Sequence, residues 1–436
     1  MPEVKIGDLK DSMFTSQIQA PKTEHIPQWT NLDPKLGAAF DLFGNGKTAL
    51  KASVGRYVAF EGLVGLPRAN GPTRRIAATA TRTWTDSNGN YYPDCRLDNP
   101  LAQNLTASGG DNCGQISNLN LGKQVAAVTY ADDILHNGRP RSWQGSASLQ
   151  QELMPGMALN VGYFRTWYQK FQATTNRALT AGNFDSFCVT VPTDAALGET
   201  SGKQICGLFD VKPANFGTVD TLITQSSNFG EESEVYDGMD IGINSRFGRG
   251  GILQGGVSIG RTVTDNCDVL DGNPQIANNP YIVGGDGTEF CRAVNTNQKQ
   301  FKMAGNYPMP FGIEASFTYQ NNPGIVVSAT RVYTRAEVLP SLGRNLNDAN
   351  VTVNVMKPFS TFGDRIQQID LRFAKSIPIG AGRRLRGNFD LYNFLNSSVV
   401  LTQNNTYPGA GARSTWQQPT QILGGRLMKV GVQIDF

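Results

Sequence analysis

The sequence predicts an all-β fold: an antiparallel barrel of the type that spans an outer membrane. Alternating strands, and connections that alternate between short turns and long polar loops, predict it. The clearest strand ends the chain, where Met428, Val430, Val432, Ile434 and Phe436 share one face and mostly polar residues share the other. A barrel strand turns such an apolar face to lipid and its polar face to the lumen. A half-buried strand of a soluble sandwich alternates in the same way, so the rest of the chain must decide.

Composition narrows the class. The chain has 436 residues, enough for one large barrel or several ordinary domains. Mean hydropathy is −0.31, and no run of eighteen apolar residues occurs, which excludes a helical membrane protein. Lys and Arg number 39 against 36 Asp and Glu, a net charge of +3 that is too balanced to indicate a nucleic-acid partner.

The first 35 residues are polar and contain the breakers Pro21, Pro27 and Pro34, so we expect residues 1–35 to be an irregular loop segment and residues 36–436 to form the barrel portion. The chain starts without a basic region followed by an apolar core, so no signal peptide is predicted. If the protein works outside the cytoplasm, we expect this start to be incomplete.

Five hairpins precede the last strand. Each pairs two alternating segments around a short turn, the first around the Asn45-Gly46 turn signal. The expected strands are 36–43 with 48–60, 142–153 with 158–171, 235–247 with 252–264, 299–307 with 312–320, and 365–376 with 384–394, followed by the final strand within 423–436. Residues 321–364 are not placed, although 325–327 and 351–355 could be short strands.

Long polar segments join the hairpins, so every long connection falls at the same end of the strands. Outer-membrane barrels have this arrangement, with short periplasmic turns and long extracellular loops, whereas a sandwich has no reason for it. Aromatic residues near the strand ends are typical of two interfacial girdles. They are Tyr57, Phe60, Trp143, Trp167, Tyr168 and Phe171 at the loop ends, and Phe43, Phe247, Phe301 and Phe311 at the turn ends.

The six cysteines all lie in long loops, as three successive pairs separated by 18, 18 and 24 positions. Short loop closures cost little entropy, so we predict three local disulfides. The pairs are Cys95–Cys113, Cys188–Cys206 and Cys267–Cys291. Disulfides indicate an oxidising compartment, and the spacing is too wide for a zinc site.

The strand count is odd. Eleven strands are expected, and the first runs from the loop side to the turn side. Single-chain bacterial barrels have an even number of strands. We therefore expect the chain to begin in the middle of a barrel, with at least one further strand upstream.

Three segments resemble TonB-dependent receptors: 33–48 (DPKLGAAFDLFGNGKT), 141–156, and 389–396 (FDLYNFLN). From about residue 30 onward the chain is most similar to the large Oar-like receptors, which carry a carboxypeptidase-regulatory-like domain ahead of a plug. The resemblance implies a 22-stranded barrel with a plugged lumen, of which these eleven strands would be the C-terminal half. The plug, the TonB box and the regulatory-like domain are absent from this sequence, so none of their residues can be assigned.

The resemblance also implies partners and a location. It places the protein in the outer membrane of a Gram-negative cell, in contact with lipid, with TonB acting through the missing N-terminal region. Val430, Val432, Ile434 and Phe436 resemble the signal read by the barrel-assembly machinery. Large extracellular loops suggest a bulky ligand, which the sequence does not identify.

The sequence predicts no enzyme and no catalytic, cofactor-binding or metal-ligating residue. His25 and His136 are isolated, and no Ser has the G-x-S-x-G context of a nucleophile. Asp132-Asp133 and the acidic segment 265–268 lack the spacing of a calcium loop, so solvated loop carboxylates are expected there. The run Arg383, Arg384 and Arg386 lies at a turn and indicates a positively charged periplasmic rim.

Two alternatives to a receptor barrel stay open. The first is a passive outer-membrane pore, which the odd strand count disfavours. The second is a secreted β-rich binding or adhesion module stapled by disulfides. An exposed lipid-facing band would separate the membrane proteins from the secreted module.

Overall fold

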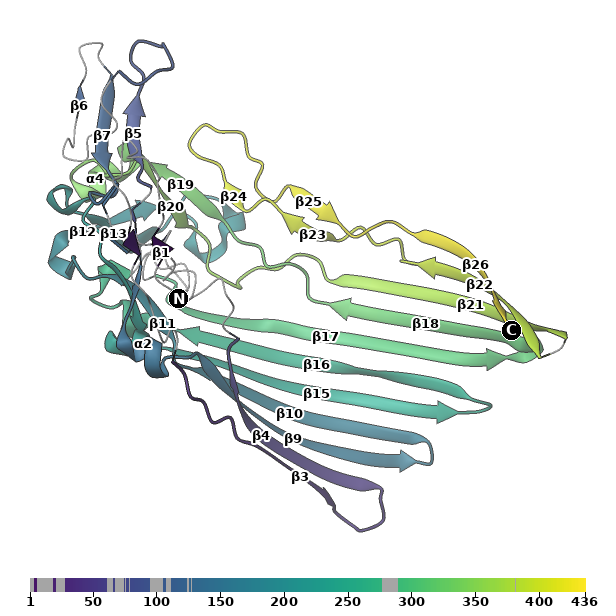
Figure 1. Cartoon of the computed structure of the whole chain (residues 1–436). Helices are drawn as coiled ribbons and strands as arrows, with labels where there is room; N and C mark the ends of the chain where they lie inside the picture. Colours follow the sequence, from purple (N-terminus) through teal and green to yellow (C-terminus); the bar gives the residue numbers. More distant parts are fainter. Residues whose placement is uncertain are drawn as a thin grey trace.

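A computed structural model describes residues 28–60, 66, 74, 76–77, 79–94, 111–123, 125–126, 128–276, 289–380 and 382–436, and the backbone of 4–5, 19–20 and 105–106. Its main feature is one antiparallel sheet of eleven long strands (Figure 1). The strands, in chain order, are β3 Lys35–Asp41, β4 Thr48–Val58, β9 Arg141–Met154, β10 Met157–Gln169, β15 Ser233–Phe247, β16 Gly251–Asp265, β17 Arg292–Met309, β18 Ile313–Asn322, β21 Ile366–Gly380, β22 Arg383–Tyr392 and β26 Leu427–Asp435. The predicted all-β, outer-membrane-barrel fold class is therefore confirmed.

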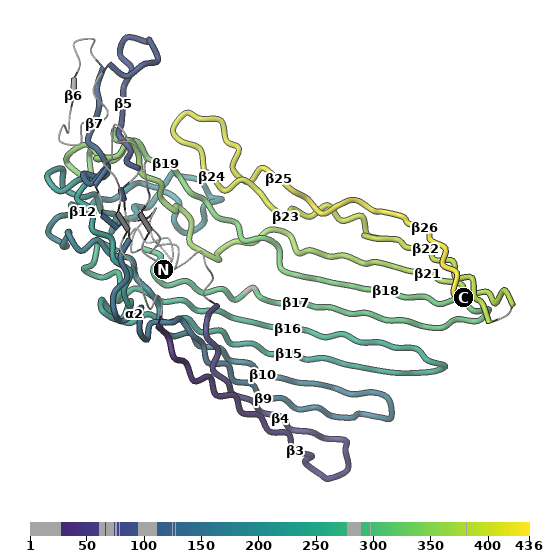
Figure 2. The backbone as a smooth tube through the Cα atoms, in the orientation of Figure 1, coloured from purple at the N-terminus to yellow at the C-terminus, as the bar shows by residue number. Residues whose placement is uncertain are grey.

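Each strand pairs with its neighbours in the chain order of the sheet, so the sheet is a simple meander. Short turns lie at one end of the strands and the long connections gather at the other, as the backbone trace in Figure 2 shows. In the first turn, Asp41 accepts hydrogen bonds from the amides of Gly44 (3.1 Å) and Gly46 (2.6 Å). Both glycines have positive φ, which suits residues without a Cβ.

The sheet has two open edges among the described residues, formed by β3 and β26. The short turn at 42–47 follows β3, and β26 follows the long connection 393–426, so both strands run from the loop end to the turn end. Direct pairing of β3 with β26 would therefore be parallel. An antiparallel closure requires an odd number of further strands between them.

One face of the sheet is apolar. Its central register row crosses seven strands, each residue pairing with the next: Phe40, Leu50, Leu149, Val161, Ile241, Val257 and Phe301. Large side chains on this face remain exposed, including Phe40 (64%), Met239 (40%) and Val430 (76%). A soluble sandwich would cover such a face with a second sheet, whereas a membrane barrel turns it to lipid.

The expected aromatic girdles are partly wrong. Trp143 and Trp167 pair with each other on the apolar face near the loop end, as a girdle requires. Tyr57 and Tyr168 lie on the polar face instead, because both oppose Ser142, which is adjacent to Trp143 and therefore points to the opposite face. Phe301 lies in the middle of β17, because that strand begins at Arg292, seven residues before the expected start.

The long loops are packed, which the sequence analysis did not predict. A hydrophobic core joins the hairpin of β12 (Phe184–Thr190) and β13 (Gln204–Val211) to β19 (Thr330–Thr334), α4 (Arg335–Leu342) and β20 (Asn350–Asn354). We call this unit the loop subdomain. Its buried side chains include Phe187, Val189, Leu208, Tyr333, Val338 and Val353.

Residues 321–364 therefore form much of the loop subdomain. The expected strand at 351–355 exists as β20, while 325–327 makes only an isolated bridge, from Val326 to Phe362. In the expected irregular segment 1–35, the described backbone of 4–5 pairs with that of 19–20, residues 28–34 have no regular structure, and β3 starts at Lys35.

Smaller elements complete the loop end. They are β1 Val4–Lys5 with β2 Gln19–Ala20; β5 Arg82–Thr85 with β6 Leu105–Thr106 and β7 Asn112–Ile116; β8 Thr129–Tyr130 with β11 Gln172–Asn176 and β14 Thr221–Gln225; β23 Val400–Gln403 with β25 Pro419–Ile422; β24 Thr406–Tyr407, paired with β19; and the helices α2 Asp132–Asn137 and α3 Cys267–Leu270. Within the described parts of the chain, no helix is long and apolar enough to cross a membrane.

Candidate functional site

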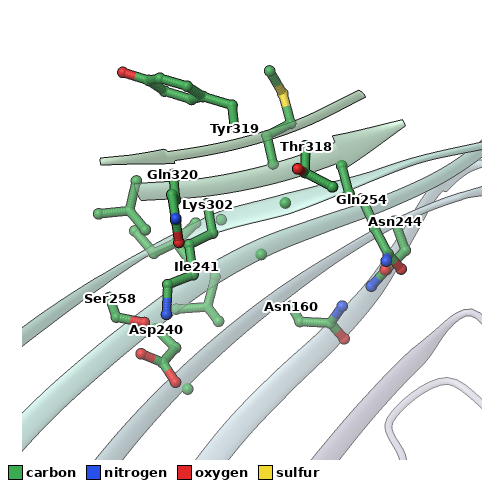
Figure 3. A pocket seen from close by; sticks show the side chains of 18 of the residues that line it. Asn160, Asp240, Ile241, Asn244, Gln254, Ser258, Lys302, Thr318, Tyr319 and Gln320 are labelled. Carbon is green, nitrogen blue, oxygen red and sulfur yellow. The ribbon is translucent and has the colours of Figure 1, made fainter. Parts of the chain in front are cut away.

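The polar face of the sheet carries a trough of about 830 Å³, built by β4, β9, β10 and β15–β18 with the start of β21. Figure 3 shows Asn160, Asp240, Asn244 and Gln254 among the polar side chains that project from these strands. Strand alternation places them opposite the apolar row described above.

Two register rows form the floor of the trough. The first contains Gln150, Asn160, Gly242, Gly256, Lys302, Gln320 and Gln368, each paired with the next. The second contains Asn244, Gln254, Ala304, Thr318 and Asp370. Amide and short side chains can donate and accept hydrogen bonds without a fixed charge, so the floor suits a wet or protein-filled lumen.

Glycine leaves the middle of the trough floor without side chains. Gly242 and Gly256 oppose each other and present no side chain to the lumen. A Cβ on Gly256 would clash with the carbonyl oxygen of Ile241, so the two strands approach too closely here for a larger residue. The volume that side chains would fill at Gly242 and Gly256 is therefore open to the lumen.

Hydrogen bonds fix the side chains around this floor. The ammonium of Lys51 donates to Gln150 Oε1 (2.9 Å). Gln320 Nε2 donates to Gln368 Oε1 (3.0 Å), and Gln368 Nε2 donates to Asp370 Oδ1 (2.9 Å). The amides of Gln150, Gln320 and Gln368 are thus held by neighbouring side chains, and the wall is polar without being strongly charged.

Toward the turn end, the polar face carries ion pairs. Arg372 donates to both carboxylate oxygens of Asp390 (2.5 and 3.1 Å), and Asp390 is only 3% exposed. Arg386 Nη2 donates to Glu314 Oε2 (2.9 Å). Bidentate arginine–carboxylate pairs combine strength with fixed geometry, so this end of the wall is rigid.

The arginine run at 383–386 was expected to form a positively charged rim, but its side chains lie beside partners on neighbouring strands. Arg386 is paired with Glu314, and the Arg383 guanidinium lies 5.8 Å from the centroid of the Phe436 ring. Arg384 opposes Asp435 in the register. The sequence could not show these partners, because they come from the neighbouring strands β18 and β26.

The cysteines are at the loop end. Cys188 bonds Cys206 across the β12–β13 hairpin, and Cys267 bonds Cys291, as expected from their spacing. Cys113 is also disulfide-bonded, whereas the expected partner Cys95 lies outside the described residues.

The acidic residues considered for calcium bind protein groups instead. Asp133 Oδ2 accepts hydrogen bonds from Thr224 Oγ1 (2.9 Å) and Asn228 Nδ2 (2.9 Å), so Asp133 is not the solvated carboxylate that we expected. Asp265 is paired with Arg292 at 3.2 Å, and Asp268 accepts from the Glu231 amide at 2.6 Å. Asp132 is exposed, as expected.

Of the two histidines, His136 lies on α2, where its Nδ1 is 3.1 Å from the Asp132 carbonyl oxygen; His25 lies outside the described residues. In the part of the chain that the structure describes, no group of three His, Cys, Asp or Glu side chains could hold a metal ion.

The terminal residues named as a barrel-assembly signal lie on the open edge. Val430 (76% exposed), Val432 and Ile434 share the apolar face of β26, and Phe436 follows at its end. Strand β26 pairs only with β22 among the described strands, so this apolar edge is accessible.

A second cavity, of about 630 Å³, opens in the loop subdomain beside Arg331, Tyr333, Glu337 and Tyr407. Arg331 Nη2 donates to Glu337 Oε1 (2.6 Å), and its guanidinium lies 4.2 Å from the Tyr333 ring centroid. Burial acts to raise the pKa of the Glu337 carboxyl, but hydrogen bonds from Thr334 and Arg331 outweigh it and hold this pKa below its ordinary value. Glu337 also closes the capping box of α4 with Thr334.

We predict that Glu337→Gln lowers the free energy of local unfolding of the loop subdomain by about 2 kcal/mol at neutral pH, because the buried Arg331 loses its charged acceptor. Because the pKa of Glu337 is lower in the folded state, its ionised carboxylate stabilises the folded state at any pH above the unfolded-state pKa. This stabilisation is lost as the pH falls through the folded-state pKa. Hydrogen exchange of α4 should therefore be faster in the variant at pH 7, and the difference should shrink as the pH falls below the ordinary glutamate pKa and through the lower pKa of folded Glu337. Glu199→Gln is the control, because the Glu199–Lys357 pair is exposed and should matter little.

Neither this cavity nor the loop subdomain around it was predicted from the sequence. Two local patterns could have found them. Phe187, Val189 and Val191 alternate like a core strand, and Thr334 precedes Glu337 at the spacing of a capping box. Both patterns lie within long polar segments, which is why composition concealed them.

The sequence matches the family model of the outer membrane beta barrel domain over residues 8–334. No curated protein matches it.

Several solved structures are similar. The outer membrane transporter YddB from Escherichia coli shares 12% identity at a TM-score of 0.46, over 92% of this chain and 40% of that one. The ferripyoverdine receptor of Pseudomonas aeruginosa shares 10% identity at a TM-score of 0.40, over 97% and 34%. The ferric-catecholate import receptor Fiu from Escherichia coli K12 shares 11% identity at a TM-score of 0.37, over 91% and 34%. The chain thus spans two fifths or less of the length of these proteins.

Proposed function

The chain belongs to the outer membrane beta barrel domain family, and from this premise we propose that it is the C-terminal wall of a larger TonB-dependent receptor of the Oar-like type. The complete receptor would import a bulky ligand across the outer membrane of a Gram-negative cell. The observation that carries the proposal is the open eleven-stranded sheet, apolar and exposed on one face and polar on the other.

The two edges support a larger barrel. Hydrocarbon offers no partners for backbone N–H and C=O groups, so a stable wall must be closed. Since β3 and β26 run in the same direction, antiparallel closure needs an odd number of additional strands. Eleven more would give the 22 strands that the resemblance implies.

The polar face supports a filled lumen. A barrel of 22 strands is wide and is plugged in outer-membrane transporters. The glycine-floored trough and its oriented amides offer hydrogen bonds to a plug domain over a broad area, with few fixed charges to desolvate. TonB would act on that plug, through a region outside this sequence.

The two alternatives fit less well. A secreted adhesion module would leave the exposed apolar face in water, where contiguous patches of this size promote association. A passive pore formed by this chain alone would need β3 and β26 to pair in parallel. We further propose that the barrel has no enzymatic role, since its polar face presents amides and ion pairs in place of a nucleophile with an adjacent base.

Uptake in whole cells tests the proposal. In cells that carry the complete receptor, ligand accumulation should be saturable and should stop when TonB is deleted, while ligand adsorption at the surface persists. The same non-saturable flux with and without TonB would contradict the receptor proposal and favour the passive pore.

Assembly gives a separate prediction. We expect Phe436→Ser to reduce strongly the amount of assembled barrel in the outer membrane, because the assembly machinery would lose the terminal aromatic of an exposed edge strand. Heat-modifiable mobility in gels measures the assembled fraction. Asp435→Ser, which changes the polar face of the same strand, is the matched control and should assemble like the wild type.

A further inference from the structure

The apolar face carries a group of charged side chains near its loop end. Arg165 on β10 pairs with Asp237 on β15, which pairs with Arg261 on β16, so the three occupy one register row. Lys299 on β17 opposes Ile259, two residues before Arg261 on the same face. We call Arg165, Asp237, Arg261 and Lys299 the outer-face cluster.

The charges of the cluster do not balance. Arg165 Nη1 donates to Asp237 Oδ1 (3.1 Å), and Tyr163 Oη donates to the same oxygen (2.5 Å). Arg261 and Lys299 are exposed, and among the described residues neither cationic head has a hydrogen-bond or ion-pair partner. Three cations and one carboxylate leave a net charge of about +2 at neutral pH.

The neighbouring register rows indicate the depth of the cluster in the membrane. One rung nearer the loops, Trp143 and Trp167 oppose each other on the same face. One rung nearer the turns, the next row on this face contains the apolar or aromatic residues Tyr163, Met239 and Ile259 and continues to Lys299. Tryptophan concentrates at the headgroup level, and arginine on a lipid-facing wall is tolerated there but costly at the midplane. The cluster therefore lies at the headgroup level of the leaflet on the loop side, which is the outer leaflet.

The ladder between β16 and β17 is interrupted at the cluster. Gly260 pairs with Gln298 and Thr262 with Asn295, so two residues of β17 oppose the single residue Arg261. Such a bulge re-aims side chains and leaves the extra residue out of the ladder. At this bulge Arg261 has no single partner residue on β17, unlike the regularly paired residues on this face.

We propose that the outer-face cluster binds the phosphate of a phosphorylated lipid of the outer leaflet. Arg261 and Lys299 supply the unpaired positive charge, and Arg165 supplies further donors in a geometry held by Asp237. The acyl chains of the same lipid would lie along the apolar rows below. The inference rests on the closed barrel proposed above, but not on ligand uptake or on TonB.

The test compares lipid retained by the assembled receptor after detergent extraction from the outer membrane. The double variant Arg261→Gln/Lys299→Gln removes the two unpaired cations. Native mass spectrometry then counts phosphorylated lipid bound per barrel as competing detergent is raised, and heat-modifiable mobility verifies assembly. Since each cation near the membrane surface contributes about fivefold, we expect retention to weaken about 25-fold when both are removed.

Two further variants sharpen the result. Arg249→Gln/Arg384→Gln removes the same charge at the turn end and should retain lipid like the wild type, whereas Arg261→Lys/Lys299→Arg keeps the charge and should also retain it. Equal retention by the first double variant and the wild type would overturn the inference, as would equal loss in the turn-end control. A wild-type receptor that does not assemble would overturn the closed barrel itself, which separates the two failures.

Discussion

Exported alone with an added signal peptide, the 436-residue chain should form no closed barrel in the outer membrane. Strands β3 and β26 would each expose a row of backbone N–H and C=O groups to hydrocarbon. Each unmet group costs several kcal/mol, so one bare edge costs on the order of tens of kcal/mol. An ordinary domain is stable by only about 5–15 kcal/mol, so no rearrangement within the sheet would offset two such edges.

The measurement is the fate of the exported chain. We expect it to be degraded or to aggregate in the periplasm, with no heat-modifiable or protease-resistant species in the membrane fraction. A receptor-deficient strain that carries it should regain no TonB-dependent uptake. A protease-resistant, heat-modifiable barrel made by this chain alone would contradict the need for further strands.

The strands themselves could be predicted closely, and the reason is physical. A lipid-facing wall forces alternation with period two, and turns such as Asn45-Gly46 fix the register between neighbouring strands. Expected and observed limits agree within a few residues for hairpins such as β15–β16. The largest difference is the start of β17, where the polar residues before Lys299 hid an extension that pairs with the loop end of β16.

The loop end could not be predicted as well, because its order depends on contacts between distant segments. Arg344 donates to Asp185 and Asp210, which lie 159 and 134 positions away in the sequence. These bonds join α4 and its following turn to the β12–β13 hairpin, and no local pattern in either segment indicates the other. Alternation along each strand was enough to predict one apolar and one polar face of the sheet. The outer-face cluster could be identified only from the register between strands, which brings its charged residues together.

A charge on the apolar face should destabilise the assembled barrel, and the same charge one residue further along should not. Val257 and Ser258 are adjacent on β16 but point to opposite faces. Val257 opposes Ile241 and Phe301 in the middle of the apolar row, whereas Ser258 opposes Asp240 and Gln300 on the polar face. This pair therefore tests which face meets lipid, because the two variants introduce the same residue at adjacent positions of one strand.

We expect Val257→Arg to destabilise the assembled receptor by about 2–4 kcal/mol, the cost of arginine near the bilayer midplane on a lipid-facing wall. Ser258→Arg should assemble normally, because its guanidinium enters a polar lumen beside the carboxylate of Asp240. Urea-induced unfolding of the receptor in lipid vesicles measures both free energies, and heat-modifiable mobility measures assembly in cells. If Ser258→Arg were the damaging variant, or if both variants were tolerated, the apolar face would not be the lipid-facing side of the wall.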